Sequence, residues 1–142
     1  MNHRTAFLNI PEVVAEVQAE FDRYERALRA HDVETLNRFF LDDPTTIRYG
    51  VAEHAYGANA IHAYRAAASP LAPGRELQHT TIITVGTCAA SVSTEFTSPT
   101  TRMIGRQSQT WVRTQAGWKI IAAHVSEVDP DTLQRGDENA HS

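Results

Sequence analysis

Four consecutive polar residues, from Arg106 to Gln109, interrupt a segment that otherwise has the composition of a buried strand. Side chains alternate along a strand, so two of the four must point towards the interior. A buried arginine needs an anionic partner, and buried amides need hydrogen bonds. Two arrangements satisfy this demand. Either Arg106 pairs within the fold, with Glu95 of the preceding strand as the candidate, or Glu95, Arg106 and Gln109 line a polar pocket for a small ligand.

Four further side chains could take part in such chemistry. Tyr24 lies on the apolar stripe of a predicted helix and faces the core, where its hydroxyl is expected to bond to a backbone group. Arg48 is the one large side chain on its face of a short strand, a pattern that favours a solvated edge position. Arg65 lies near the edge of another predicted helix. His124 shares a strand face with apolar residues, which is as typical of a packed histidine as of a pocket acid or base.

Composition narrows the function classes. The 142 residues carry a formal net charge of −4, which provides no basic surface for nucleic acid. No apolar run approaches the ~20 residues of a membrane span. A single cysteine cannot form an internal disulfide, which suits the cytoplasm. The sequence has no HExxH, GxSxG or CxxC motif, so it predicts neither a metal site nor an activated nucleophile, and no cofactor is expected.

The elements that must position these residues follow the order helix, helix, strand pair, helix and four long strands. Helical spacing of apolar residues predicts helices over 11–30 and 57–68, and Asp32 is a good N-cap for a short helix between them. Extended segments predict a strand pair within 45–56 and strands over 79–85, 89–96, 103–113 and 118–128, the last two joined around Gly117. Alternation through the final strand places on one face Trp118, Ile120, Ala122, His124 and Ser126.

Helices segregated from a long antiparallel sheet indicate an α+β fold. We expect three N-terminal helices packed in a strongly curved antiparallel sheet, a cone-shaped roll whose open mouth is a natural ligand site. Residues 1–128 would form this single domain, and residues 129–142 a polar C-terminal tail.

Five separated motifs make the sequence resemble a known family. They are YERAL at 24–28, TIRYG at 46–50, YGANAIHAYR at 56–65, GRQSQTWVR at 105–113 and GWKIIAAHVS at 117–126. In this order and spacing they resemble the AtzH-like (HpxZ-like) family of the SnoaL-like and ketosteroid-isomerase-like superfamily, whose cone is also called cystatin-like. The resemblance covers roughly residues 12 to 128.

The resemblance implies a function. Proteins of this family accompany amidases in bacterial nitrogen catabolism, and the namesake activity is decarboxylating hydrolysis of 1,3-dicarboxyurea to allophanate. It implies a homodimer, with a tetramer also compatible, and a catalytic pair that falls on Tyr24 and Arg48. The remaining pocket residues follow from polarity and position: Arg65, Glu95, Arg106, Gln109 and His124.

Two other functions use the same residues. A non-catalytic accessory protein could hold a small anionic amide for a partner amidase, because the same arginines would bind it. Isomerase-type proton transfer on a nonpolar ring ranks last. It needs a carboxylate base in an apolar cavity, and the candidates Glu53 and Glu95 lie among polar residues.

Overall fold

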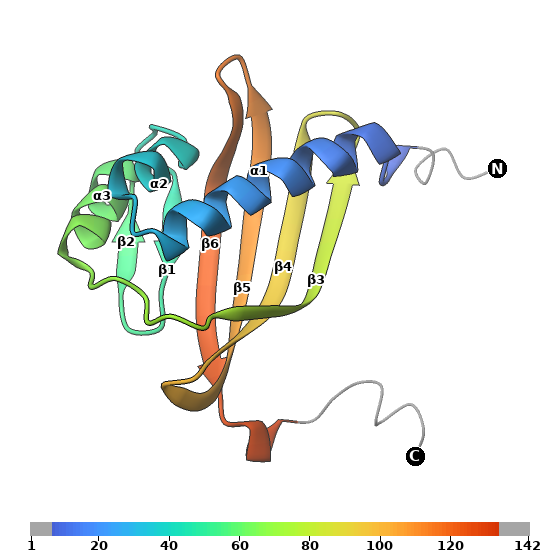
Figure 1. Cartoon of the computed structure of the whole chain (residues 1–142). Helices are drawn as coiled ribbons and strands as arrows, with labels where there is room; N and C mark the ends of the chain where they lie inside the picture. The colour runs from blue at the N-terminus through green and yellow to red at the C-terminus, as the bar shows by residue number, and fades with distance from the viewer. Residues whose placement is uncertain (1–6, 134–142) are drawn as a thin grey trace, which may run out of the picture.

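The computed structural model describes residues 7–133, which form three helices and one six-stranded sheet (Figure 1). This confirms the predicted α+β class. The helices are α1 (Pro11–Arg29), α2 (Val33–Phe39) and α3 (Ala58–Ala67). The strands are β1 (Ile47–Tyr49), β2 (His54–Tyr56), β3 (Glu76–Val85), β4 (Ala89–Ser98), β5 (Thr101–Thr114) and β6 (Gly117–Val128), and a 3-10 turn follows at Pro130–Thr132.

Local signals set the helix ends. Pro11 occupies the first turn of α1, where its missing N–H costs nothing. The helix stops where His31 adopts a left-handed φ of 52°, and the amides of His31 and Asp32 close back onto the carbonyls of Leu28 and Ala27. Asp32 then caps α2, because its carboxylate accepts from the Thr35 amide at 3.2 Å.

The strands lie in the order β2-β1-β6-β5-β4-β3. All neighbours are antiparallel except β1 and β6, which run parallel with Ile47 opposite Ala122, so the sheet is mixed rather than wholly antiparallel. β3 is irregular between Gln78 and Thr81, where His79 has a positive φ. Figure 1 shows β3 bending sharply along its length, which brings its first half across one end of the sheet.

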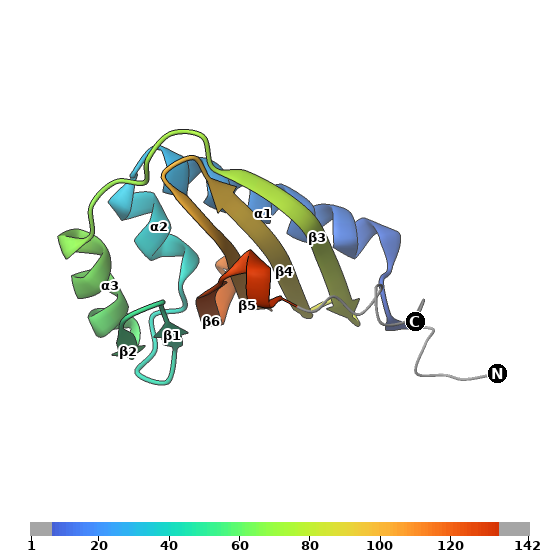
Figure 2. The same ribbon diagram turned by 90° about the horizontal axis from the view of Figure 1, so that it is seen from below.

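One face of the sheet packs on the helices. α1 crosses β3 to β6, while α2 and α3 lie at the end that carries β1 and β2, as Figures 1 and 2 show together. The core between these layers includes the fully buried side chains of Val17, Phe21, Leu36, Ile61, Trp111 and Ile120. The opposite face, called here the outer face, carries no described helix. Within residues 7–133, no helix has the length and apolarity needed to cross a bilayer.

The predicted faces of β6 are wrong for half of the strand, because the strand contains a bulge. In the β5–β6 register Thr110 lies opposite Ala122 but Trp111 lies opposite Ile120, so Ile121 is an extra residue. Trp118 and Ile120 therefore face the core. Ala122, His124 and Ser126, which were predicted to share that face, lie beyond the bulge and point to the opposite face, because one inserted residue reverses the alternation of side chains.

Candidate functional site

Tyr24 anchors the candidate site from α1 and is 3% exposed. Its hydroxyl has no hydrogen bond to a described residue, so the expected backbone partner is not present. Burial raises the pKa of this phenol, and the positive charges of Arg65 and then Arg48 offset part of the rise. Three aromatic rings hold the phenol edge-on, with centroids 5.6, 6.4 and 6.5 Å away, and they belong to Phe39, Phe40 and Trp111.

Arg48 lies on the inner face of β1 and is buried, so the solvated edge position that its pattern favours is wrong. Its Nη1 donates to Glu53 Oε1 at 2.5 Å across the β1–β2 turn. Its guanidinium also stacks on the Tyr64 ring, with Cζ 4.5 Å from the centroid. Gly50 makes this arrangement possible, because a Cβ there would overlap the Glu53 carboxylate and Arg48 Nη1.

Arg65, on α3, is a buried cation without a counter-ion in the described part of the chain. It is 7% exposed, and its Nε is buried without an acceptor. Its side chain makes no ion pair or hydrogen bond with a described residue, and its Cζ lies 5.5 Å from the centroid of the Tyr64 ring. A desolvated charge without a partner is costly, and an anionic ligand would remove that cost.

Sequence reasoning missed a buried ion pair that lies beside Tyr24. The side chains of Glu25 and Arg75 are 6% and 7% exposed, and Arg75 donates from Nε to Oε1 at 3.0 Å and from Nη2 to Oε2 at 3.2 Å. Gln107 joins both partners: its Oε1 accepts from Arg75 at 3.2 Å and its Nε2 donates to Glu25 at 3.3 Å. One of the two inward glutamines of β5 is thus part of this network.

The sequence contained a signal for one member of this pair, Glu25. Glu25 stands four residues after Phe21 and three before Leu28, on the apolar stripe of α1, where a carboxylate requires a buried cation. Its partner could not be identified in the same way. Arg75 precedes β3 beside the loop residues Pro73 and Gly74, where no local pattern distinguishes it from a solvated arginine.

A hollow of about 250 Å³ opens beside Arg75, between the loop at 70–75 and the turn joining β4 to β5. The Phe96 ring forms part of its wall and stacks on the Arg75 guanidinium, 4.1 Å from Cζ. Gly105 lies against that ring, and any side chain at this position would overlap the ring. A ligand in this hollow would contact Arg75 directly.

Two of the predicted pocket residues, Glu95 and Arg106, lie instead on the outer face, apart from Tyr24 and Arg48. They stand opposite each other in the β4–β5 register, and Arg106 Nε donates to Ser126 Oγ at 3.1 Å. This position corrects their assignment to the pocket and favours the alternative of pairing within the fold. Alternation is the reason, since the inner positions of β5 are those of Gly105, Gln107, Gln109 and Trp111.

His124 is also placed on the outer face and is exposed. The bulge in β6 turns it away from the side that carries Trp118 and Ile120. Its ring makes an edge contact with Tyr49, with centroids 5.7 Å apart. The assignment of His124 to the pocket is therefore corrected as well.

Gln109 does lie on the inner face, where it is 2% exposed. Its Oε1 accepts from Trp111 Nε1 at 3.1 Å, while its Nε2 donates to no described residue. In the register of the sheet only Ala123 separates Gln109 from Arg48. Of the predicted site residues, the structure thus gathers Tyr24, Arg48, Arg65 and Gln109 on the inner side.

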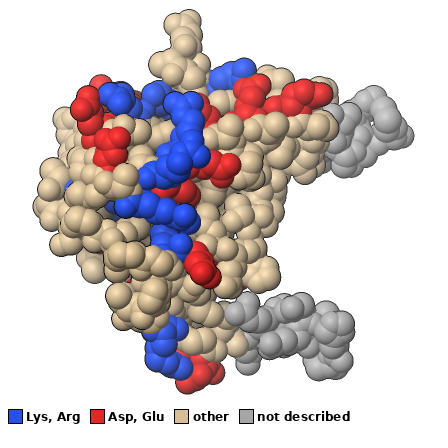
Figure 3. Space-filling view, viewed as in Figure 1, with Lys and Arg blue, Asp and Glu red and all other residues tan. Residues whose placement is uncertain are grey.

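The charges of this cluster favour an anion. Three buried guanidiniums, those of Arg48, Arg65 and Arg75, accompany two carboxylates, those of Glu25 and Glu53, which leaves one net positive charge. By contrast, acidic and basic side chains are mixed over the surface near α1 (Figure 3). Among the described residues, no three His, Cys, Asp or Glu side chains lie together as metal ligands. The arrangement suits a small molecule with carboxylate and carbonyl oxygens.

Solved structures share this fold. A protein of unknown function from Pectobacterium atrosepticum is 45% identical, with a TM-score of 0.84 over 87% of this chain and 96% of that chain. A cystatin-like fold protein from Burkholderia xenovorans is 50% identical, with a TM-score of 0.83 over 85% of this chain and 95% of that chain. A ketosteroid isomerase-like protein from Erwinia carotovora atroseptica is 15% identical, with a TM-score of 0.67 over 85% of this chain and all of the other, a likeness of fold alone.

No match was found among curated proteins. The model of one protein family, described as AtzH-like, matches residues 6–131, which span nearly the whole sequence. The motifs that suggested this family include those that carry Tyr24, Arg48 and Arg65, the residues gathered in the buried cluster. The chain belongs to the AtzH-like family.

Proposed function

We propose that this protein is a cofactor-free enzyme that decarboxylates carboxylated ureas, with 1,3-dicarboxyurea as substrate and allophanate as product. One observation carries the proposal. Tyr24, Arg48 and Arg65 form a buried group of donors, and neither the Tyr24 hydroxyl nor the Arg65 guanidinium has an acceptor among the described residues. A substrate with two carboxylates and a urea carbonyl supplies those acceptors.

The two arginines take different parts of the substrate. Arg65, which has no protein counter-ion in the described chain, binds the carboxylate that remains in the product, each charge-assisted hydrogen bond contributing about 1.5–3 kcal/mol. Arg48 is fixed by Glu53 and by the Tyr64 ring. A fixed cation suits the urea oxygen, where negative charge develops during the reaction.

The chemical step breaks the bond between one urea nitrogen and its carboxylate carbon. The carboxylate leaves as CO2, and the electron pair of the broken bond stays on the nitrogen and is shared with the urea oxygen. Tyr24 donates its proton to that nitrogen and regains a proton from water. A raised pKa keeps Tyr24 in the acid form that this step requires. The net reaction consumes one proton and releases one CO2.

The test measures CO2 and allophanate release from freshly prepared 1,3-dicarboxyurea with and without the protein. We expect acceleration above the spontaneous rate and its loss in Arg48→Ala. Arg106→Ala is the matched control. It also removes an arginine side chain, but from the outer face, and should keep the activity.

A rate equal to the spontaneous one would contradict the proposal. The accessory function would then be favoured, in which the same cluster holds an anionic amide for a partner amidase. Calorimetric titration with small carboxylates distinguishes that outcome, because binding without turnover would still depend on Arg48 and Arg65.

A further inference from the structure

The geometry points to a wider substrate class than carboxylated ureas: the site recognises a dicarboxylate whose carboxylates flank a central carbonyl, whether NH or CH2 links them, and it therefore also decarboxylates 3-oxoglutarate. This inference rests on the proposed function, because it uses the same donors. 3-Oxoglutarate has the connectivity of 1,3-dicarboxyurea, with each NH replaced by CH2.

The argument concerns hydrogen-bond acceptors. A site that recognises the two N–H groups of a urea must offer acceptors to them. The buried carboxylate nearest in sequence to Tyr24 is Glu25, and both of its oxygens already accept from Arg75, one of them also from Gln107. The Gln107 oxygen in turn accepts from Arg75. This network is therefore satisfied internally.

Two further residues with acceptors beside the cluster, Gln109 and Glu53, have those acceptors engaged as well. Gln109 Oε1 accepts from Trp111, and Glu53 accepts from Arg48 through Oε1 and from the Ala52 amide through Oε2 at 3.3 Å. The groups left over are the Arg65 guanidinium and Gln109 Nε2, which can only donate, and the Tyr24 hydroxyl, which is the donor in the proposed step.

A site with spare donors and engaged acceptors recognises oxygen atoms of its ligand and does not recognise linking N–H groups. Discrimination against an analogue that lacks an N–H arises only where a buried acceptor would be left without its donor. The carboxylate and amide oxygens named above each already accept at least one hydrogen bond, so exchanging NH for CH2 leaves none of them without a donor.

The reaction of the analogue is balanced in the same way. The bond between the α-carbon and one carboxylate carbon breaks, CO2 leaves, and the electron pair passes to the enolate formed by the α-carbon and the central oxygen. Arg48 stabilises that oxygen, and Tyr24 delivers a proton to the carbon before it is reprotonated by water. The product is acetoacetate, whose remaining carboxylate stays on Arg65.

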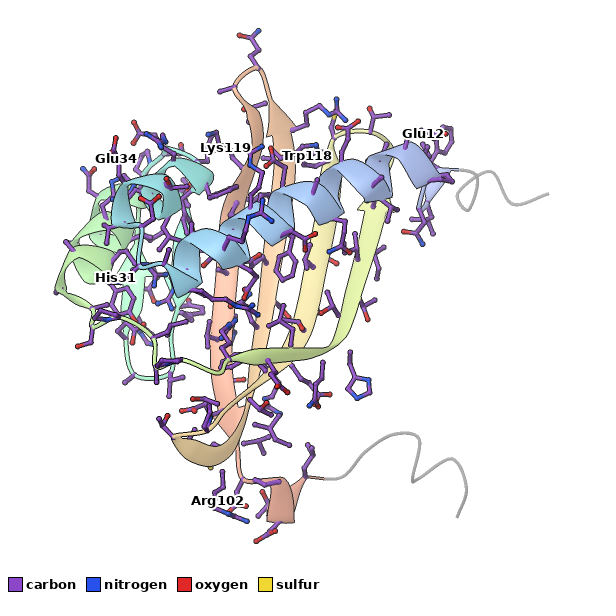
Figure 4. The ribbon with its side chains drawn as sticks, viewed as in Figure 1. Glu12, His31, Glu34, Arg102, Trp118 and Lys119 are labelled. Carbon is purple, nitrogen blue, oxygen red and sulfur yellow. The ribbon has the colours of Figure 1, made fainter. Side chains whose placement is uncertain are left out.

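The experiment follows CO2 and acetoacetate release from 3-oxoglutarate, alongside 1,3-dicarboxyurea, at neutral pH. The buffer contains a chelator and no primary amine, since metals and amines decarboxylate β-keto acids without an enzyme. The sequence has one lysine, Lys119, whose Nζ donates to the Arg38 carbonyl at 2.6 Å. Figure 4 shows it on β6 near Trp118, at the end of the molecule opposite Arg102. Lys119→Met removes the one lysine amine and should keep the rate.

We expect at least a tenfold acceleration over the spontaneous loss of CO2 from 3-oxoglutarate. Arg65→Met and Arg65→Gln should each lose it at least tenfold, while Arg106→Met keeps it. Circular dichroism and thermal unfolding identify any variant that does not fold. If Arg65→Met does not fold, Arg65→Gln alone is used to test the role of Arg65.

The two substrates separate the outcomes. Acceleration of both supports the inference. Acceleration of 1,3-dicarboxyurea with 3-oxoglutarate left at its spontaneous rate overturns the inference and leaves the proposed function standing. Acceleration of 3-oxoglutarate alone supports the dicarboxylate class and overturns the urea as substrate. Inertness towards both overturns the inference together with the proposed function.

Discussion

Arg48 and Arg65 show how two buried arginines beside one aromatic ring can differ in task. Both guanidiniums lie near the Tyr64 ring, but only Arg48 has a carboxylate partner in the described chain. A cation fixed on both sides needs no reorganisation when charge develops beside it. A cation without a partner is suited to bind an anionic group of a ligand. The proposed function therefore assigns electrostatic stabilisation and ligand binding to different side chains.

At the same scale, replacement of the phenol tests the proton donor. Tyr24→Phe removes the hydroxyl and keeps the ring that packs on Phe39, so the fold should survive. We expect the decarboxylation rate to fall about a hundredfold, the usual contribution of a positioned acid. Tyr49→Phe on the outer face is the control. A near-normal rate in Tyr24→Phe would remove it from the acid role.

Burial of Tyr24 also predicts a dependence of stability on pH. Its pKa in the folded protein is raised above the ordinary value because burial disfavours the phenolate. As pH rises past about 10, the unfolded chain releases this proton before the folded chain does, so the free energy of unfolding falls. Urea unfolding between pH 8 and 11 should show a steeper decline for the wild type than for Tyr24→Phe. Parallel pH profiles would contradict the prediction.

At the scale of elements, the turn between β1 and β2 couples backbone shape to the site. Gly50→Ala places a methyl group where the Glu53 carboxylate and Arg48 Nη1 now lie, so the pair must separate. The Arg48 side chain is 8% exposed and that of Glu53 is 28% exposed, so separating the pair should cost about 1.5–3 kcal/mol of stability. In the folded variant, activity should fall at least tenfold, because Arg48 loses its position. A folded variant with an unchanged rate would argue against this role.

The salt bridge between Glu25 of α1 and Arg75, just before β3, should contribute chiefly to stability. Arg75→Met leaves Glu25 buried without its counter-ion, which typically costs about 3–5 kcal/mol. Glu25→Gln combined with Arg75→Met removes both charges and should recover part of that loss. Urea unfolding of the two single variants and the double variant measures the coupling. Additive losses would show that the two side chains do not act as a pair.

Much of the element order could be predicted because its signals are local. Pro11, Asp32 and Gly117 mark helix starts and a hairpin turn within a few residues of where they act. The faces of β6 could not be predicted, because an extra residue at Ile121 reverses alternation without any local sign such as glycine. The partner of Arg75 could not be predicted either, because Glu25 lies 50 residues away in the sequence.

The candidate site was partly predictable for a related reason. Tyr24 and Arg48 were found through their motifs, whereas pattern alone placed Arg48 in solvent. Glu95 and Arg106 were correctly taken as neighbours, since they are opposite each other in the ladder. Which side of the sheet they occupy depends on packing against α1, and a one-residue change of register is enough to alter it.

For the whole molecule, we propose that the outer face is covered by a second copy of the chain. Its centre has small polar side chains, such as Ser93 and Ser108, whose hydroxyls lie 3.1 Å apart. Its edges expose Tyr56, Ile83 and Val85. Small residues allow close approach of two sheets, and exposed apolar side chains at the margins favour association.

The prediction for that surface is a change of mass. Ser108→Arg introduces a long charged side chain at the centre of the outer face, opposite Ser93 and His124. Light scattering after size exclusion should give two chains for the wild type and one for the variant. Ala116→Arg, an exposed substitution at the β5–β6 turn, should leave the dimer intact. A wild-type mass of one chain would contradict the proposal.

The parallel pairing of β1 with β6 has a consequence for biosynthesis. Ile47 to Tyr49 pair with Ala122 to His124, which are synthesised 75 residues later. Contacts between segments so distant in the chain form late, since closing the intervening loop costs entropy. A nascent or truncated chain that lacks β6 therefore lacks the strand that holds β1, and with it Arg48, in the sheet.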